Sequence, residues 1–199
     1  MRIFNPLTIP FALLMAWSIP GFAQLPPALG QPDAATVATA AAVKPILVGV
    51  GPAGAEAQVN LSYGAFELAG SHVSGTKYIP VVSLFTHAVI TKLELPGEIS
   101  ESKAPAGLKK ILLVGFSPKA LGALGLPVLA QPTVKDGKRA LQLKDYKVNK
   151  DYLKPLEDLV KLTQAEDGSW YFAILQPLPA GHYLITFNNR PTGYWDFDV

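Results

Sequence analysis

Apolar and polar residues alternate with a period of two along much of the chain after residue 45. In AQVNLSY, from Ala57 to Tyr63, every second residue is apolar, which is the pattern of a strand with one buried face. The alternation returns near the C-terminal end in HYLITF, which begins at His182, and in YWDFDV, which begins at Tyr194. We expect one set of side chains to point inward: Tyr183, Ile185, Phe187, Trp195, Phe197 and Val199.

Other segments carry β-branched or continuous apolar runs that predict further strands. KYIPVVSLF begins at Lys77, AVITKLELPG begins at Ala88, and the apolar run KKILLVGF begins at Lys109. Asp136-Gly137 separates two more runs and predicts a tight hairpin, because both residues tolerate the positive φ of a two-residue turn. Short strands at intervals of about ten residues, with turn residues between them, predict an antiparallel β-sandwich.

Signals for helices are few. Ser117 and Pro118 suit the N-cap and the first position of a short helix in SPKALGALG. DYLKPLEDLVKL fits two structures: Leu156 to Leu162 match a short helix face, whereas LVKLT also suits a strand paired with GSWYFAIL. We therefore expect a mainly β domain over residues 45–199, with one or two short helices.

Two segments precede this domain. Residues 1–23 combine Arg2, an apolar run shorter than a bilayer span, and small residues before Ala23, which is typical of a cleaved Sec-type signal peptide. Gln24–Lys44 consists mostly of Pro, Ala, Gly and Thr, which predicts a flexible linker with an Ala-rich helix after Asp33 as an option. We expect a periplasmic or extracellular protein with no membrane span after signal cleavage.

The charge is close to neutral. The chain has 17 Lys and Arg residues against 15 Asp and Glu residues, and removal of residues 1–23 takes away only Arg2. This balance gives no electrostatic reason to expect nucleic acid or an anionic membrane as a partner. The sequence contains no cysteine, which excludes disulfides, thiol catalysis, zinc–thiolate sites and iron–sulfur clusters.

The stretch GVGPAG, from Gly49 to Gly54, satisfies the G-x-G-x-x-G pattern of dinucleotide-binding proteins. That chemistry needs a helix at the third glycine and an acidic residue about 20 positions later. Here an alternating pattern follows, Glu67 comes too early, and the next acid is Glu94. We interpret the motif as a loop that reverses the chain, and we expect no cofactor.

Residues with catalytic potential are scattered. The three histidines are His72, His87 and His182, and no H-x-x-x-H or G-x-S-x-G motif occurs. A metal-dependent hydrolase using His72, His87 and a distant carboxylate is one alternative, because imidazole and carboxylate groups bind transition metals. Our main expectation is a chain with no catalytic residues and no metal site.

Aromatic residues are better candidates for binding. Trp170-Tyr171 and Tyr194-Trp195 lie near the C-terminal end, and alternation leaves Tyr171 and Tyr194 outside the core. Together with His182, these two tyrosines form the predicted ligand-contact surface. Tyrosine rings stack on sugar rings through their apolar faces, so the alternative function is a carbohydrate-binding module.

The segment Leu178 to Tyr183 resembles the L-x-P-G-x-Y turn that opens a late strand in many immunoglobulin-like and fibronectin-like domains. The resemblance implies a tyrosine corner, in which the Tyr183 hydroxyl bonds to upstream backbone. The order of motifs is also similar to that of a group of uncharacterised exported bacterial proteins with an L-P-G, P-G-x-Y and D-F-G-hydrophobic pattern. The matching stretches are Leu95-Pro96-Gly97, the Lys135 to Arg139 turn, Pro179 to Tyr183, and Asp196 to Val199.

These observations predict an immunoglobulin-like β-sandwich that acts as a non-catalytic binding or structural module of the bacterial cell envelope. Its expected partner is an envelope protein or a glycan. The carbohydrate-binding module and the metal-dependent hydrolase are the two alternatives.

Overall fold

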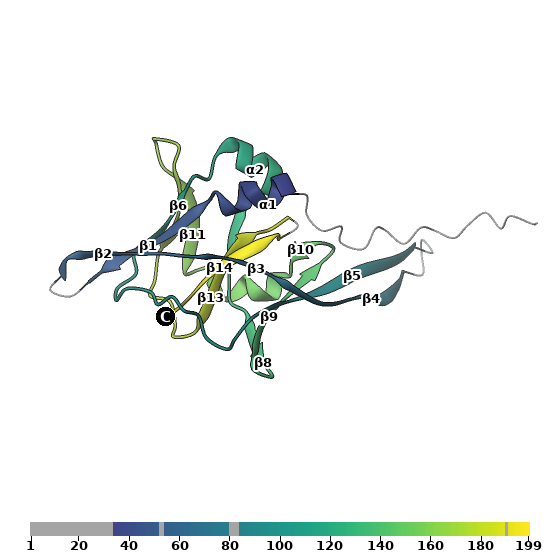
Figure 1. Cartoon of the computed structure of the whole chain (residues 1–199). Coiled ribbons are helices and arrows are strands. Elements are labelled where there is room, and N and C mark those ends of the chain that lie inside the picture. The colour runs from purple at the N-terminus through teal and green to yellow at the C-terminus, as the bar shows by residue number, and fades with distance from the viewer. Residues whose placement is uncertain (1–33, 52–53, 80–83, 190) are drawn as a thin grey trace, which may run out of the picture. The chain divides into compact units, whose positions relative to one another are not determined.

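The computed structural model describes the backbone of residues 34–51, 54–79, 84–189 and 191–199. It describes the side chains of the same residues except those between 71 and 88. Within this part the chain is mainly antiparallel β structure, as the alternation predicted, and its strands form three sheets (Figure 1). Residues 1–33, which hold the predicted signal peptide, lie outside the described part. No helix among the described residues has the length and apolar character that a bilayer span requires.

Sheet A has five strands and sheet B has four, in the orders β11-β12-β6-β1-β2 and β3-β14-β13-β7. The strands of sheet A are β11 (Val160–Gln164), β12 (Trp170–Ile174), β6 (Lys110–Val114), β1 (Lys44–Val50) and β2 (Glu56–Asn60). The strands of sheet B are β3 (Tyr63–Ala65), β14 (Gly193–Asp198), β13 (His182–Phe187) and β7 (Pro127–Ala130).

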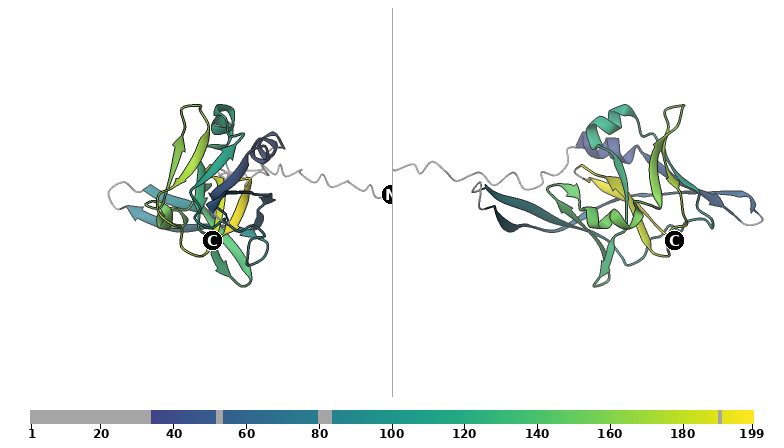
Figure 2. Two further views of the ribbon diagram at one scale, coloured as in Figure 1. Left: turned by 90° about the vertical axis from the view of Figure 1, so that its left-hand side faces the viewer. Right: turned by 180° about the vertical axis from the view of Figure 1, so that it is seen from behind.

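Sheet C has the order β10-β9-β5-β4, and β8 pairs with the other end of β9. Its strands are β10 (Lys147–Val148), β9 (Lys138–Lys144), β5 (Leu84–Leu95), β4 (Glu67–Ile79) and β8 (Thr133–Lys135). Because β5 pairs with β9 only from Ile90 to Leu95, the far half of the β4–β5 hairpin extends past β9 as a two-stranded ribbon (Figure 2).

Sheet B is the middle layer, and both of its faces are buried. Tyr183, Ile185 and Phe187 point into one core together with residues of sheet A such as Ile111 and Phe172. In Figure 1 the yellow strands β13 and β14 lie between the helices α1 (Ala34–Ala41) and α2 (Pro118–Leu124) on one side and β9 on the other. The second face of sheet B packs on sheet C in a separate core.

The inward set predicted from alternation is confirmed except for one residue. Tyr183, Ile185, Phe187, Trp195 and Phe197 are at most 1% exposed. Val199 follows the end of β14 and is 42% exposed, so its predicted burial is wrong.

The opposite set, which we expected to face solvent, is largely buried as well. Leu184 and Thr186 are fully buried, and Tyr194 is only 5% exposed. The reason is sheet C, whose Leu93 and Leu141 cover this face. A period of two shows that two faces differ, but it does not show whether a second sheet covers the more polar one.

The folded part begins before the predicted boundary at Pro45. Helix α1 packs against α2, and Ala40 and Val43 are buried in the core shared with sheet A. The predicted linker over residues 24–44 therefore does not extend to Lys44. The Ala-rich helix that the sequence allowed after Asp33 is present as α1. Its lack of large apolar groups favours a linker by composition, yet small side chains allow a helix to pack closely.

Two loops behave as their sequences predict. β1 and β2 form an antiparallel hairpin in which Val50 pairs with Glu56, so the GVGPAG stretch turns the chain, as predicted. Asp136 and Gly137 have φ values of 53° and 76° and connect β8 to β9. Positive φ at both positions is the geometry that favours this dipeptide in a two-residue hairpin.

The helix signals are also resolved. The Ser117 side chain accepts a hydrogen bond from the backbone N–H of Ala120 at the start of α2, as the N-cap prediction required. The ambiguous segment forms two short 3₁₀ turns, η2 (Lys150–Tyr152) and η3 (Lys154–Leu156), and then strand β11. β11 pairs with β12, so the strand alternative holds for the second half of this segment.

Candidate functional site

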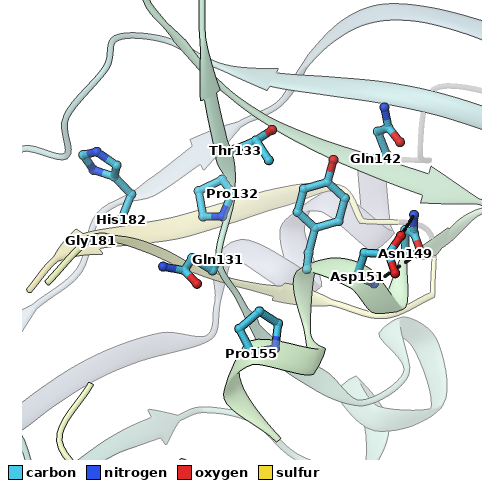
Figure 3. Close-up of a pocket in the computed structure, with 10 residues that line it drawn as sticks. Gln131, Pro132, Thr133, Gln142, Asn149, Asp151, Pro155, Gly181 and His182 are labelled. Carbon is cyan, nitrogen blue, oxygen red and sulfur yellow. Dashed lines mark hydrogen bonds between the residues drawn. The ribbon is translucent and has the colours of Figure 1, made fainter. Parts of the chain in front are cut away.

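A groove of about 400 Å³ lies where the start of β13 meets the β7–β8 connection and the η2 turn (Figure 3). Its volume falls in the range of roughly 300–1,000 Å³ that small-molecule sites occupy. Figure 3 shows His182 at one end of the view and Asn149 with Asp151 at the other, with Pro132 and Gln131 between them. The polar side chains that line it are Gln131, Thr133, Gln142, Asn149, Asp151, Tyr152 and His182.

His182 is held in place by an acidic partner on the neighbouring strand. It pairs directly with Asp198 in the β13–β14 ladder, and its Nδ1 lies 2.7 Å from Asp198 Oδ1. A carboxylate can only accept, so Nδ1 carries the proton and Nε2 is left for a ligand. The second carboxylate oxygen of Asp198 accepts from the Ser100 backbone N–H at 3.1 Å, which fixes the carboxylate in turn.

Tyr152 is the aromatic residue that lines the groove. It belongs to η2, whose N-cap Asn149 accepts a hydrogen bond from the Asp151 backbone N–H, and its side chain is 9% exposed. Burial raises the pKa of the Tyr152 hydroxyl, and a hydrogen bond with Thr133 partly offsets this shift. At neutral pH the phenol is protonated and can serve as a donor or an acceptor.

Two glutamines supply uncommitted hydrogen-bonding groups. The backbone of Gln131 is fixed because its N–H donates to the Tyr152 carbonyl at 3.0 Å, and Gln142 lies in β9. Among the described residues, neither side-chain amide has a hydrogen-bond partner. Each amide offers two donors and one acceptor oxygen to a ligand in the groove.

The structure does not bring the three predicted contact residues together. His182 lines the groove with a side chain that is 27% exposed. Tyr194 points into the core beneath sheet C, with its ring 5.0 Å from that of Phe66, so the predicted exposure of Tyr194 is wrong. Tyr171 is half-buried in β12 of sheet A, away from the residues of the groove.

Sequence reasoning missed most of the groove. Gln131, Gln142, Asn149 and Tyr152 come from three separate segments that carry no shared motif. The only local signal was the N-x-D pattern from Asn149, which is typical of a capped turn. Their convergence depends on the pairing of β8, β9 and β10, which sequence alone does not reveal.

The described side chains include no group of three His, Asp or Glu residues that could hold a metal ion. The backbones of His72 and His87 lie in β4 and β5, but their side chains are outside the described set. The metal-dependent hydrolase therefore stays a prediction. Elemental analysis of the purified protein tests it, and a stoichiometric metal content would support it.

Comparison with protein-family models, with curated proteins and with solved structures finds no significant match to this chain.

Proposed function

We propose that the chain is an exported, non-catalytic binding module of the bacterial cell envelope, and that the groove beside His182 holds its ligand. The observation that supports this proposal most directly is the pair of unpartnered amides of Gln131 and Gln142, which line the same groove as Tyr152 and His182. Placement outside the cytoplasm rests on the signal-peptide pattern of residues 1–23.

The chemistry of the groove suits a neutral, hydroxyl-rich ligand such as a short oligosaccharide. Amide groups, a phenol and an imidazole both donate and accept hydrogen bonds, as sugar hydroxyls do. Pro132 and Pro155 add apolar surface against which a sugar ring can pack. Asp151 is the one carboxylate among the lining residues; it accepts a hydrogen bond from Asn149 Nδ2 at 3.2 Å and is exposed, so water and salt screen its charge.

We also propose that sheets A and B together form an immunoglobulin-like sandwich to which sheet C is an addition. Two observations support this view. The larger core lies between sheets A and B, and the Tyr183 hydroxyl donates to the Pro179 carbonyl at 2.6 Å, as a tyrosine corner requires. Under this proposal sheet C supplies much of the ligand groove, because Gln142, Asn149 and Thr133 lie on or beside the strands of sheet C.

Isothermal titration of the purified protein with chitotriose, cellotriose and maltotriose tests the ligand class. We expect at least one of these neutral trisaccharides to bind. We expect Gln131→Ala and Gln142→Ala to weaken that binding about tenfold each, since each loses a hydrogen bond worth about 1 kcal/mol or somewhat more. Tryptophan fluorescence is a poor readout because Trp195 is buried and Trp170 packs on Phe116.

Gln176→Ala is the matched control, because Gln176 is an exposed glutamine outside this groove. If none of the three sugars binds at millimolar concentration, the oligosaccharide proposal is wrong. If Gln176→Ala weakens binding as much as Gln142→Ala does, the ligand lies elsewhere.

A further inference from the structure

The face of sheet A that points away from the core has an ordered set of side chains. Cross-strand register places five residues side by side in one row that crosses all five strands. Alternation turns this row away from Leu47, Ile111 and Phe172, which fill the core. The row consists of Thr163, Tyr171, Leu112, Ile46 and Asn60.

Lysines lie on both sides of this row. The next row on one side contains Lys161, Ala173 and Lys110, which are paired in register. On the other side Lys44 pairs with Val114. The three lysines are exposed and form no ion pair with any described residue. We call Ile46, Leu112, Tyr171 and these three lysines the cationic face.

The exposure of the side chains on the cationic face indicates which kind of partner it can bind. Lys44, Lys110 and Lys161 are exposed, whereas Ile46, Leu112 and Tyr171 are half-buried. The apolar groups therefore form a floor between charged groups that extend above them. The nearest acid in register is Glu56, at the end of the edge strand β2, and its carboxylate accepts from the Gln58 amide at 2.9 Å.

We infer that the cationic face binds an acidic polysaccharide. The apolar face of a sugar ring can stack on Tyr171, while carboxylates at the edges of the polymer pair with the lysines. Lys110 and Lys161 lie two strands apart, or about 10 Å, so they contact charges on different sugar residues. This surface is separate from the groove beside His182 and does not depend on the function proposed for that groove.

Two other anionic partners, a lipid bilayer and single-stranded nucleic acid, match this arrangement of exposed lysines and half-buried apolar residues less well. A bilayer requires a set of apolar side chains that reach past the charged ones into the acyl region. Here Ile46, Leu112 and Tyr171 are half-buried, which leaves Val114 as the one exposed apolar side chain in the rows named above. Single-stranded nucleic acid is usually held by several aromatic rings on which successive bases stack. The two rows contribute one ring, that of Tyr171.

The test is affinity electrophoresis of the purified protein through gels containing polygalacturonate. Fully methyl-esterified polygalacturonate serves as the uncharged polymer with the same backbone. We expect retardation by the acidic polymer at low salt, little retardation by the ester, and a loss of retardation as salt is added. The double variant Lys110→Gln/Lys161→Gln should bind about tenfold more weakly, as expected when two exposed ion pairs are lost.

Lys135→Gln/Lys147→Gln is the matched control, because it makes the same change of charge at two exposed lysines on sheet C. Tyr171→Ala should weaken binding without any change of charge, and circular dichroism melting verifies that it folds. If it does not fold, the paired lysine variants decide the outcome. Gln142→Ala should bind polygalacturonate as wild type does, which separates this proposal from the groove.

Three results would overturn the inference. These are no retardation by polygalacturonate at low salt, equal retardation by the ester, or equal losses in the test and control lysine variants. Tighter binding to phosphatidylglycerol vesicles or to oligo(dT) than to polygalacturonate would assign the surface to a membrane or to nucleic acid instead.

Discussion

The two faces of the β13–β14 pair are both buried, but different interactions hold them. One face is apolar and aromatic: the Trp195 ring packs edge-on against Phe187, and Tyr183 stacks on Phe197. The other face is mixed, because Leu184 and Tyr194 alternate with Thr186 and Asp196. The apolar face is stabilised by area removed from water, whereas burial of the mixed face depends on a partner for each polar group.

The Thr186 hydroxyl finds its partner within sheet B, where it donates to the Gly193 carbonyl at 2.7 Å, whereas the partner of Asp196 comes from sheet C. Arg139 of β9 is 3% exposed, and its guanidinium pairs with Asp196 across the layers. The same guanidinium donates to the carbonyls of Pro96 and Gly97 at 3.1 and 3.2 Å. The Leu95-Pro96-Gly97 turn therefore supplies acceptors for a buried charge as well as reversing the chain.

The largest effect should come from the apolar face. Trp195→Ala removes a ring that is 1% exposed and should lower the free energy of unfolding by about 4 kcal/mol, because neighbouring rings cannot fill the cavity. Urea denaturation measures the change. Trp170→Ala, at a half-buried tryptophan of sheet A, should cost clearly less. Equal costs would mean that the apolar face is not the main source of stability.

On the mixed face, a single substitution at Arg139 should lower the free energy of unfolding more than a double substitution at Arg139 and Asp196. Arg139→Met leaves the Asp196 carboxylate and two carbonyls without their donor and should cost about 3 kcal/mol. Adding Asp196→Leu should restore much of that loss, since an apolar pair can replace a buried ion pair. Denaturation of the single and double variants measures both values. A double variant that is less stable than either single one would contradict this account.

The hydrogen bond of the Tyr183 hydroxyl, on the apolar face, should give a smaller effect. Tyr183→Phe loses the hydrogen bond to Pro179 and should cost about 1 kcal/mol or somewhat more. Tyr171→Phe is its control, because no described residue hydrogen-bonds to the Tyr171 hydroxyl. Indistinguishable denaturation midpoints for the two variants would show that this hydrogen bond contributes nothing to stability.

The smallest effect should come from an ion pair outside both faces. Hydrogen bonds from Lys138 and Lys92 hold the pKa of Glu94 below its ordinary value of 4.5. Because the folded-state pKa is the lower one, its contribution is present above pH 4.5 and is lost as the pH falls through the folded-state pKa. Glu94→Gln should therefore flatten the acid side of the stability curve, whereas Glu98→Gln, at an exposed turn position, should not. Matching curves for Glu94→Gln and wild type would remove this role for Glu94.

Local features were predictable from sequence because their causes are local. The cap at Ser117, the Asp136-Gly137 turn and the Tyr183 hydrogen bond each depend on a few adjacent residues. The apolar face of β13 was predictable for the same reason, since apolar and polar residues alternate within the sequence of that one strand.

The third layer and the groove were not predictable, because they depend on which distant strands meet. Asp196 looks like a solvent-facing residue until Arg139 is known to lie against it. Gln131 and Gln142 acquire a shared surface only once β9 pairs with β8 and β10. Alternation predicts that polar residues in strands face solvent, and this prediction fails wherever a long-range partner satisfies them.

The position of β14 in sheet B determines when the sheet can be completed during synthesis of the chain. β14 follows every other strand along the chain, yet it lies between β3 and β13. A chain synthesised from its N-terminus cannot join β3 to β13 until residue 198 has emerged, so shorter nascent chains leave apolar strand edges uncovered. Those nascent chains are the forms that chaperones would have to protect, and the closing step of folding is the insertion of a strand into a gap.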